Sequence, residues 1–336
     1  NSEGQLGVGH TRDQVSLARC VTEAGAAFPP AGWEVVRVAC AATCTAVLCR
    51  DATQTAVWLS GRPPWEAPVT TAFRRMEEAK GVVDVAATWD CFYVVVRGEV
   101  WALGASNAYG QWGAGRDAPP GAWHRVRLPR GVCVRAMAGG VRHCLVAVDE
   151  RGQHVVYGWG QARHGELRRV PPTPPYVWYT PVVVHAWPAT HASSLALGMH
   201  HTVIGAYARG ETELVAYGSN RRGQLDVPRG RRPGRWIPTC NWHTTLVWGD
   251  DVMEAYGARQ HGQGVGPGVP CRGAVQVSSG SEHSAMLRDG VVYGWGWDEH
   301  GSVGGGGAAV GAPRVLASEA EGVWTGYGTT WVKLRA

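Results

Sequence analysis

Short apolar runs recur along the chain, separated by turns rich in glycine, proline and charged residues. In the clearest case an apolar run ends at Leu287, Arg288-Asp-Gly290 supplies a turn, and a second apolar run leads to Gly296. Such runs bounded by turn residues predict β-strands joined in hairpins. The one helix-like pattern, residues 72–80, is short and ends at Gly81, so we interpret it as a loop turn. The pattern therefore predicts an all-β protein.

One strand–turn–strand unit occurs seven times. Each copy has a small residue, two variable positions and then a histidine or small polar residue before the second strand, and the clearer copies end in an aromatic-glycine pair. The anchor positions are residues 44, 90, 143, 201, 243, 283 and 329, so six intervals span 285 residues with a mean of 47.5. This period fits four short strands per unit, which is the content of one propeller blade.

A polar turn signature follows the aromatic-glycine pairs. Its fullest copy is Asn220-Arg-Arg-Gly-Gln-Leu225, and residues 1–6 read Asn-Ser-Glu-Gly-Gln-Leu. The glycine predicts a turn with positive φ. Together with elements such as Gly280-Ser-Glu-His283, this signature resembles the regulator of chromosome condensation repeat family over essentially the whole chain. The resemblance implies a seven-bladed β-propeller, which we predict as a single domain over residues 1–336.

Two regions depart from the repeat. Residues 60–65 read Ser-Gly-Arg-Pro-Pro-Trp where the second blade should carry the turn signature, so we expect that blade to be distorted or looped out. The chain also begins inside a turn signature, without methionine, and ends in the strand pattern of residues 331–334. Propellers seal the first blade to the last because open strand edges template aggregation. We expect about eight upstream residues to supply the missing strand, and an incomplete seal without them.

Composition narrows the class of protein. With 45% apolar residues, 47 glycines and 17 tryptophans, the chain can bury enough surface to fold. The longest nearly uninterrupted apolar stretch, residues 38–49, has 12 residues, short of the ~20 that cross a bilayer. The nine cysteines include no C-x-x-C pair, so we interpret them as buried apolar residues in a reducing compartment. The net charge of +5 is weak evidence for nucleic-acid binding.

The chain lacks the G-x-x-x-x-G-K-[ST], H-E-x-x-H and G-x-S-x-G motifs, so we predict no enzymatic activity, no cofactor and no metal of its own. The rival class is an enzyme, which would need acid-base groups that converge in one pocket. His200 and His201 are adjacent, and neighbouring strand residues face opposite sides, which argues against a shared metal. The repeat histidines occur once per blade at His143, His201, His243 and His283. We interpret them as structural residues that hydrogen-bond backbone groups within their own blades.

Two sets of side chains are candidates for partner binding. Aromatic and charged residues on rigid loops are typical of interface centres. The first set comprises Trp89, Trp242, Trp297, Glu299 and His300. For residues 298–300 the alternative is a solvated turn. The second set is the arginine run Arg221, Arg222, Arg229, Arg231, Arg232 and Arg235. This run fits a phosphate group, an acidic protein or no ligand at all.

The closing segments, residues 293–301 and 326–332, are similar to the yeast alpha-tubulin-suppressor (killer-toxin-insensitivity) branch of the family. That resemblance implies a scaffold in cytoplasm and nucleus that binds a small CSL-type metal-binding protein. Such a complex would support diphthamide synthesis and Elongator-dependent modification of the tRNA wobble uridine, with the metal in the partner. Direct tRNA contact stays open, and no membrane partner is expected. The alternative is a guanine-nucleotide exchange factor for a small Ran-like GTPase. No copy carries the G-W-R-H-T motif of plant ultraviolet receptors, so light sensing is not expected.

Overall fold

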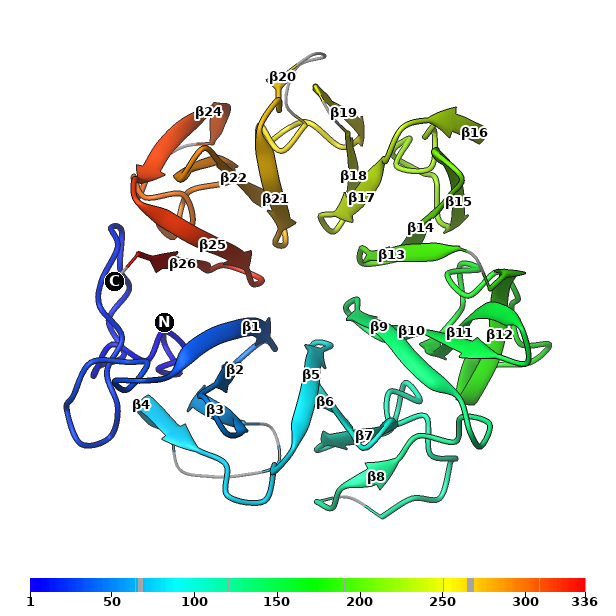
Figure 1. Ribbon diagram of the computed structural model, residues 1–336, viewed down its shortest axis with the longest axis horizontal. Helices are drawn as coiled ribbons and strands as arrows, with labels where there is room; N and C mark the ends of the chain where they lie inside the picture. The colour runs from blue at the N-terminus through cyan, green and yellow to red at the C-terminus, as the bar shows by residue number, and fades with distance from the viewer. Residues whose placement is uncertain are drawn as a thin grey trace.

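A computed structural model describes residues 1–63, 65, 69–119, 121–189, 191–249, 251–264, 269–307 and 309–335. These residues form 26 β-strands and no helix. The strands form sheets arranged around a central axis, as in a propeller (Figure 1). The prediction of an all-β propeller is confirmed. Within the described ranges, no helix has the length and apolar character needed to span a membrane.

Consecutive strands pair antiparallel within each blade. Blade 1 contains β1 (Glu34–Cys40), β2 (Cys44–Arg50), β3 (Thr55–Gly61) and β4 (Thr70–Arg75). Blade 2 contains β5 (Val82–Ala87), β6 (Cys91–Val96), β7 (Glu99–Gly104) and β8 (His124–Arg125). Blade 3 contains β9 (Cys133–Gly139), β10 (His143–Glu150), β11 (Gln153–Gln161) and β12 (Val177–Pro188). The first strand of each blade lines the axis (Figure 1).

The second half of the ring repeats this order. Blade 4 contains β13 (Ala192–Leu197), β14 (His201–Ala208), β15 (Glu211–Gly218) and β16 (Gly230–Pro233). Blade 5 contains β17 (Ile237–Cys240), β18 (Thr244–Trp248), β19 (Val252–Gly257) and β20 (Val269–Pro270). Blade 6 contains β21 (Ala274–Ser279), β22 (His283–Arg288), β23 (Val291–Gly296) and β24 (Val310–Ala317). A last sheet contains only β25 (Ala320–Thr325) and β26 (Thr330–Leu334).

The prediction of seven blades is wrong. The described residues form six four-stranded blades, and the seventh repeat copy forms a two-stranded sheet, β25–β26. This copy supplies only the inner hairpin of a blade. Residues 1–33, which run beside this sheet, form turns and two isolated bridges rather than strands. Six complete blades and one hairpin therefore surround the axis.

Packing between neighbouring blades explains why the second strands read as continuous apolar runs. All five residues of β18 are buried, and in β10 the six residues from His143 to Val148 are buried. A strand covered on both faces has no solvent-facing positions to alternate with its core positions. The cores accordingly lie between blades: Tyr93 of blade 2 packs with Met137 of blade 3 in one cluster.

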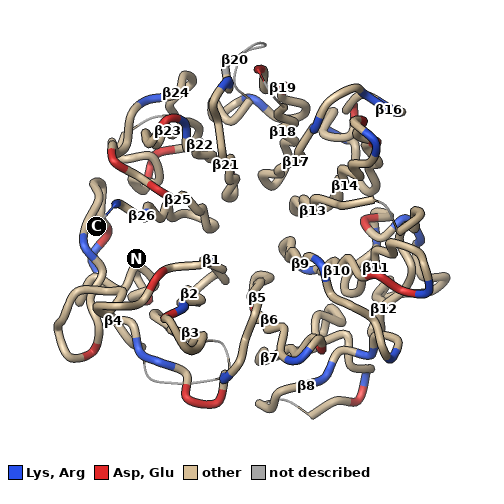
Figure 2. The backbone as a smooth tube through the Cα atoms, viewed as in Figure 1, with Lys and Arg blue, Asp and Glu red and all other residues tan. Residues whose placement is uncertain are grey.

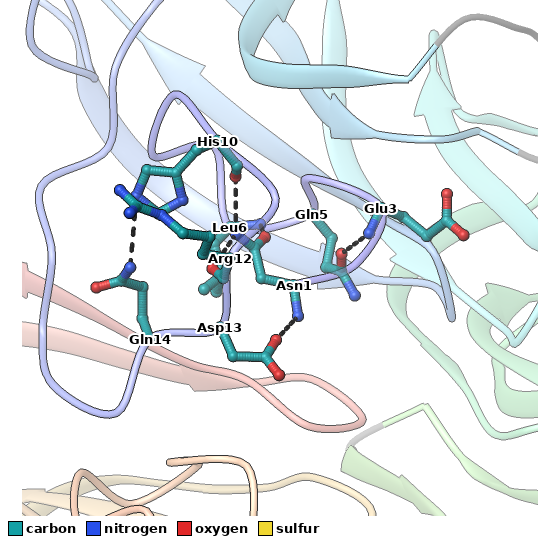
Figure 3. Close-up of polar contacts among 8 residues, drawn as sticks. All are labelled: Asn1, Glu3, Gln5, Leu6, His10, Arg12, Asp13 and Gln14. Carbon is teal, nitrogen blue, oxygen red and sulfur yellow. Dashed lines mark hydrogen bonds and ion pairs between the residues drawn. The ribbon is translucent and has the colours of Figure 1, made fainter.

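The ring closes between β26 and blade 1. Trp331 packs against Phe73 with ring centroids 5.8 Å apart, and Lys333 Nζ lies 2.9 Å from Glu34 Oε1. The amino-terminal segment folds into polar turns beside this junction (Figure 3), where the Asn1 side chain donates to the carbonyls of His10 and Arg12. The chain termini thus lie close together in the ring (Figure 1).

The departure at residues 60–65 begins in the last two residues of β3, in the sheet numbered blade 1 here and expected as the second blade from the sequence. Blade 1 keeps four strands, and the register of β3 with β4 shifts between Leu59 and Gly61. Ser60 ends up buried, and its hydroxyl donates to the carbonyl of Gly4 at 2.8 Å. The sequence places Pro64 in this connection, but that residue lies outside the described ones. The same register shift occurs between Gly158 and Gly160 in blade 3 and between Gly294 and Gly296 in blade 6, so the described residues do not show the expected distortion of this blade.

Candidate functional site

One end of the ring, called the loop face here, is built from two kinds of connection. Because the strands of a blade run antiparallel, the loop between its first and second strands and the turn between its third and fourth strands meet at the same end. Contacts bear this out: the Arg142 guanidinium in the β9–β10 loop lies 3.8 Å from the ring centroid of Tyr109 in the β7–β8 turn. All five residues of the first predicted set, Trp89, Trp242, Trp297, Glu299 and His300, lie on these two kinds of connection.

The turn signature is explained by side chains that satisfy the backbone of the turn. Asn220 Oδ1 accepts the N–H of Leu225 at 2.7 Å, and Gln224 Oε1 accepts the N–H of Arg222 at 2.9 Å. Gly223 between them has φ +82°, a conformation that favours glycine. The asparagine, glycine and glutamine of Asn-x-x-Gly-Gln-Leu therefore stabilise this polar turn on the loop face.

All seven first-to-second-strand loops close with the same backbone hydrogen bond. In blade 3 the N–H of Gly140 donates to the carbonyl of His143 at 2.8 Å. The residue that accepts this bond in successive sheets is Cys44, Cys91, His143, His201, Thr244, His283 and Thr329. Two anchors of the sequence analysis, residues 90 and 243, are therefore one position too early.

His243 does not occupy the position of the repeat histidines. Thr244 pairs with Gly257, as His143 pairs with Gly160. A Cβ on Gly257 would lie 2.3 Å from the carbonyl oxygen of His243, and one on Gly160 would lie 2.4 Å from that of Arg142. His243 therefore matches Arg142, half-buried on the loop face, and burial lowers the pKa of its imidazole.

The three histidines at the buried position join neighbouring blades. His143 Nε2 lies 3.0 Å from Thr202 Oγ1, His201 Nε2 lies 3.1 Å from Thr245 Oγ1, and His283 Nε2 lies 3.2 Å from the carbonyl oxygen of Thr329. Burial lowers the pKa of His143 and His283 to about 4 and that of His201 to about 3. Their partners belong to the next sheet, not to the same blade as predicted.

The glycine of Gly-x-x-His makes room for the histidine ring. A Cβ on Gly280 would lie 2.4 Å from Cε1 of His283, and one on Gly198 would lie 2.1 Å from Cε1 of His201. No real Cβ tolerates such contacts, so the ring and the missing side chain are two parts of one packing arrangement.

Three aromatic side chains meet at the axis. Trp89, Trp242 and Tyr327 come from the loops of blade 2, blade 5 and the two-stranded sheet. Ring centroids are 4.9 Å apart for Trp89 and Tyr327, 6.2 Å for the two tryptophans, and 6.3 Å for Trp242 and Tyr327. The Tyr327 hydroxyl donates to the carbonyl of Gly140 at 3.3 Å, and Trp89 is 40% exposed. This axial cluster borders a cavity of about 100 Å³ lined by the ends of the first strands.

Backbone hydrogen bonds between successive loops hold this cluster. The N–H of Ala42 donates to the carbonyl of Trp89 at 2.9 Å, and the N–H of Trp89 donates to that of Val141 at 3.0 Å. On the opposite side, Met199 donates to Trp242 at 3.0 Å, and Trp242 donates to Ser281 at 2.8 Å. The axial tryptophans are thus fixed by the loops on both sides of them.

A second aromatic group lies at the blade 6 turn. The Trp297 ring is 5.0 Å from that of His300 and 6.4 Å from that of His261, measured between centroids. His261 Nε2 lies 3.2 Å from an oxygen of Glu282. Glu299 and His300 are exposed. Asp298 is buried, and its carboxylate accepts the N–H of Val303 at 2.8 Å, so this residue supports the turn.

The candidate arginines fall on two different elements. Arg221 and Arg222 are exposed in the turn after β15, whereas Arg231 and Arg232 lie on β16 at the outer edge of blade 4 (Figure 2). Both guanidinium nitrogens of Arg232 bind Glu254, at 2.9 and 3.1 Å. This arginine also stacks on Trp236. The Arg232 side chain therefore binds residues of the ring itself.

Sequence reasoning missed several residues of the loop face. Tyr327 occupies the same loop position as Trp89 and Trp242, and aligning the seven loops by their closing bonds would have found it. Glu166 was missed because it stands where four other turns carry glutamine: Gln5, Gln111, Gln224 and Gln263. Its contacts with His164 and His200 join two different blades.

Comparison with known proteins supports this architecture. No protein-family model matches the chain. The Ultraviolet-B receptor UVR8 of Arabidopsis thaliana is 28% identical over 215 residues, which cover 64% of this chain and 40% of that protein. The Secretion-regulating guanine nucleotide exchange factor of Bos taurus is 27% identical over 288 residues, which cover 70% of this chain and 60% of that protein. The chain therefore spans about half the length of these curated relatives.

A solved structure agrees in fold. Prp20p from Saccharomyces cerevisiae superimposes with a TM-score of 0.69 and 19% identity, covering 90% of this chain and 83% of that one. At this identity the likeness concerns the fold alone. The curated relatives add sequence similarity over 64% and 70% of this chain. In sequence and in fold, the chain is therefore similar to regulator of chromosome condensation (RCC1)-like repeat proteins.

Proposed function

We propose that the chain is a non-catalytic propeller that binds a partner protein through its loop face. The observation that carries this proposal is the axial cluster, where Trp89 remains 40% exposed although its backbone is fixed on both sides. Protein interfaces typically have aromatic anchors at the centre and a polar rim. Here Arg142, His243 and Glu282 supply polar and charged groups on the loops beside the cluster.

The second aromatic group extends this surface. Trp297 is half-buried, and His300 and Glu299 are exposed beside it. A typical interface covers about 800 Å² on each partner, enough to include both the centre of a ring and one of its turns. The proposal therefore includes all five predicted residues as contacts, with Trp89 and Trp242 central and the blade 6 turn peripheral.

The partner we propose first is a small GTPase of the Ran type. One relative is named a guanine nucleotide exchange factor, and Prp20p is described together with its binding to Gsp1p and histones. Exchange factors act by binding a GTPase and loosening its nucleotide, which needs no covalent chemistry. This function is compatible with a chain that lacks the common catalytic motifs.

A second candidate partner is the small CSL-type metal-binding protein of diphthamide synthesis. Residues 293–301 and 326–332, which carry the resemblance to the alpha-tubulin-suppressor branch, contribute Trp297, His300 and Tyr327 to the loop face. In this case the chain would be a scaffold, in cytoplasm and nucleus, that supports Elongator-dependent tRNA modification.

Calorimetric titration with each purified candidate, together with release of a fluorescent GDP analogue from the GTPase, tests the proposal. Trp89→Ala should weaken the complex by about 2 kcal/mol, or about 30-fold, as expected for a central aromatic anchor. Trp297→Ala combined with His300→Ala should also weaken it. Arg151→Ala is the matched control, because this side chain is 91% exposed in the β10–β11 hairpin at the opposite end.

The two partners give distinguishable results. Accelerated nucleotide release indicates the exchange function, whereas a stable complex with the CSL-type protein and no effect on nucleotide indicates the scaffold. If Trp89→Ala and Arg151→Ala bind equally well, the loop face is not the interface. If neither protein binds, both candidate partners are excluded.

A further inference from the structure

Three metal-ligand side chains meet at the junction of blades 3 and 4. His164 and Glu166 belong to the turn after β11, and His200 belongs to the loop before β14. One ligand atom from each residue lies within 4.8 Å of the other two. We propose that these residues bind one divalent transition-metal ion of the Zn²⁺ type, which bridges the two blades.

The carboxylate is a departure from the other turns. Gln5, Gln111, Gln224 and Gln263 stand at the same turn position, and each accepts the N–H two residues earlier at 2.7–3.0 Å. Glu166 Oε2 accepts the equivalent N–H, that of His164, at 2.8 Å. Glutamine would satisfy the turn without burying a charge. The hydrogen bonds of the turn therefore do not require a carboxylate at position 166.

The charge of Glu166 is held inside the protein. Its side chain is 1% exposed, and burying an ionised carboxylate is costly unless it is paired or coordinates a metal. The groups that face this carboxylate are the backbone N–H of His164 and the ring of His200, and an ionised carboxylate is the form that ligates a metal.

His200 offers an unused ring nitrogen to the same point. Its Nδ1 is shielded from solvent, has no hydrogen-bond partner among the described residues, and lies 3.7 Å from Glu166 Oε1. This separation is too long for a hydrogen bond but suits two ligands of one ion, since zinc–ligand bonds of about 2.0–2.2 Å span it. The His164 ring lies 4.6 Å from that of His200, between centroids.

The position of the cluster indicates a structural role for the ion, namely to join two neighbouring blades. Backbone hydrogen bonds join the loop of Ala42 to the loop of Trp89, and the loop of Trp89 to the loop of Val141. A second series of such bonds begins at the loop of Met199. Among the described residues, no such bond joins Val141 to Met199, and none joins Tyr327 to Ala42 where the ring closes. The first of these gaps is the junction of blades 3 and 4, so a metal held by His164, Glu166 and His200 would join the loop face there.

The ligand set also defines the chemistry of the site. Two imidazoles and one carboxylate form a common zinc set that leaves a coordination position for water or another ligand. His164 and His200 are half-buried, so the site opens toward the loop face. Adjacent strand residues face opposite sides, which argues against a metal shared by His200 and His201, whereas the proposed site joins His200 to a turn of another blade.

Zn²⁺ titration of the isolated chain by calorimetry, without an oligohistidine tag, is the first measurement. Cys133 is the exposed cysteine among the nine, so the parent protein carries Cys133→Ser to remove thiol binding. We expect one Zn²⁺ per chain. Loss of a residue that only orients a metal ligand typically weakens metal binding by roughly 10- to 100-fold. Glu166→Gln and His200→Ala each remove a ligand, so each should weaken Zn²⁺ binding by more than this. Glu166→Gln restores the residue of the other turns, so the fold should persist.

The matched control is His261→Ala. His261 lies 3.2 Å from Glu282 and belongs to another histidine–carboxylate pair on the loop face, at blades 5 and 6. This variant should retain one Zn²⁺ with unchanged affinity. Co²⁺ absorption provides a second readout, with ligand-field bands in the parent and none in Glu166→Gln. Equal Zn²⁺ affinity in parent and Glu166→Gln, or no saturable binding in the parent, would overturn the proposal. This test uses no partner, so its outcome is independent of the proposed function.

Discussion

The buried histidine of blade 6 makes folding sensitive to acid in a way that one substitution can isolate. Nε2 of His283 donates to the carbonyl of Thr329 at 3.2 Å, because a carbonyl can only accept. Its Nδ1 is buried and has no hydrogen-bond partner in the described part of the chain. Protonation would place an N–H there without an acceptor. Burial accordingly lowers the pKa of His283 from 6.5 to about 4.

The sign and size of the effect follow from this pKa difference. The unfolded chain takes up the proton near pH 6.5 and the folded chain only near pH 4. The contribution of His283 to stability is therefore complete above pH 6.5 and is lost as the pH falls from 6.5 through 4. Linkage gives a loss of about 2 kcal/mol in unfolding free energy between pH 7 and pH 5.

His283→Thr is the appropriate perturbation, because Thr244 and Thr329 occupy the same loop position in the same ring. The variant should lose about 1–3 kcal/mol at pH 7, since it forfeits an inter-blade hydrogen bond and packing contacts. Between pH 7 and pH 5, however, it should lose about 2 kcal/mol less than the parent.

Urea denaturation followed by tryptophan fluorescence at pH 7, 6 and 5, with a chelator present, measures both quantities. His300→Thr, at an exposed position, is the control for replacing a histidine outside the buried loop position. If the curves of unfolding free energy against pH for the parent and His283→Thr are parallel, His283 does not resist protonation in the folded ring, and the reasoning fails.

Three further substitutions, one of them with a matched control, test the packing of the ring by the same denaturation assay. Gly160→Ala should lower the free energy of unfolding by about 2–4 kcal/mol, because φ is +103° and the new Cβ would lie 2.4 Å from a backbone oxygen. Gly152→Ala, where φ is +76° and no atom lies within 4 Å of the new Cβ, should lower it by about 1 kcal/mol. Equal losses would contradict the steric argument. Trp331→Ala should lower the free energy of unfolding by about 3–5 kcal/mol, because it leaves a cavity in the cluster that packs β26 against blade 1. A loss below 1 kcal/mol would mean that this cluster does not close the ring. Asn241→Ala should cost about 2–3 kcal/mol, since its buried amide donates to two carbonyls of blade 6, and no loss would exclude that link.

The blade pattern was predictable because it is local. Hairpins such as β22–β23 carry their own turn residues, and second strands covered on both faces read as apolar runs. The number of complete blades was not predictable in this way. Residues 326–329 close like the loops of the complete blades, yet the two-stranded sheet ends with β26, and residues 1–33 add turns and bridges instead of strands. Strand pairing between distant segments decides this point.

The register of blade 5 was misread for a related reason. His243 follows the small residue Cys240 at the same spacing as His283 follows Gly280, but the pairing of Thr244 with Gly257 fixes the buried position one residue later. The partners of the buried histidines were also misassigned. A bond such as that between His143 and Thr202 depends on how blades face each other, which the repeat alone does not encode.

The candidate site could be predicted only in part. The loop position of Trp89 and Trp242 indicated residues near one mouth of the ring, and they meet at the axis. Their contact with Tyr327 required the fold, because the three loops are far apart in the chain. The functional role of these residues stays a prediction.

Hydrogen–deuterium exchange of the chain with and without each candidate partner tests the central claim most directly. Protein docking on the loop face predicts slower exchange in residues 88–90, 241–243 and 297–301. It also predicts unchanged exchange in the hairpins at the opposite end, residues 97–98, 151–152 and 209–210. Protection confined to those hairpins, or a bound partner that protects none of the loop-face segments, would contradict the account.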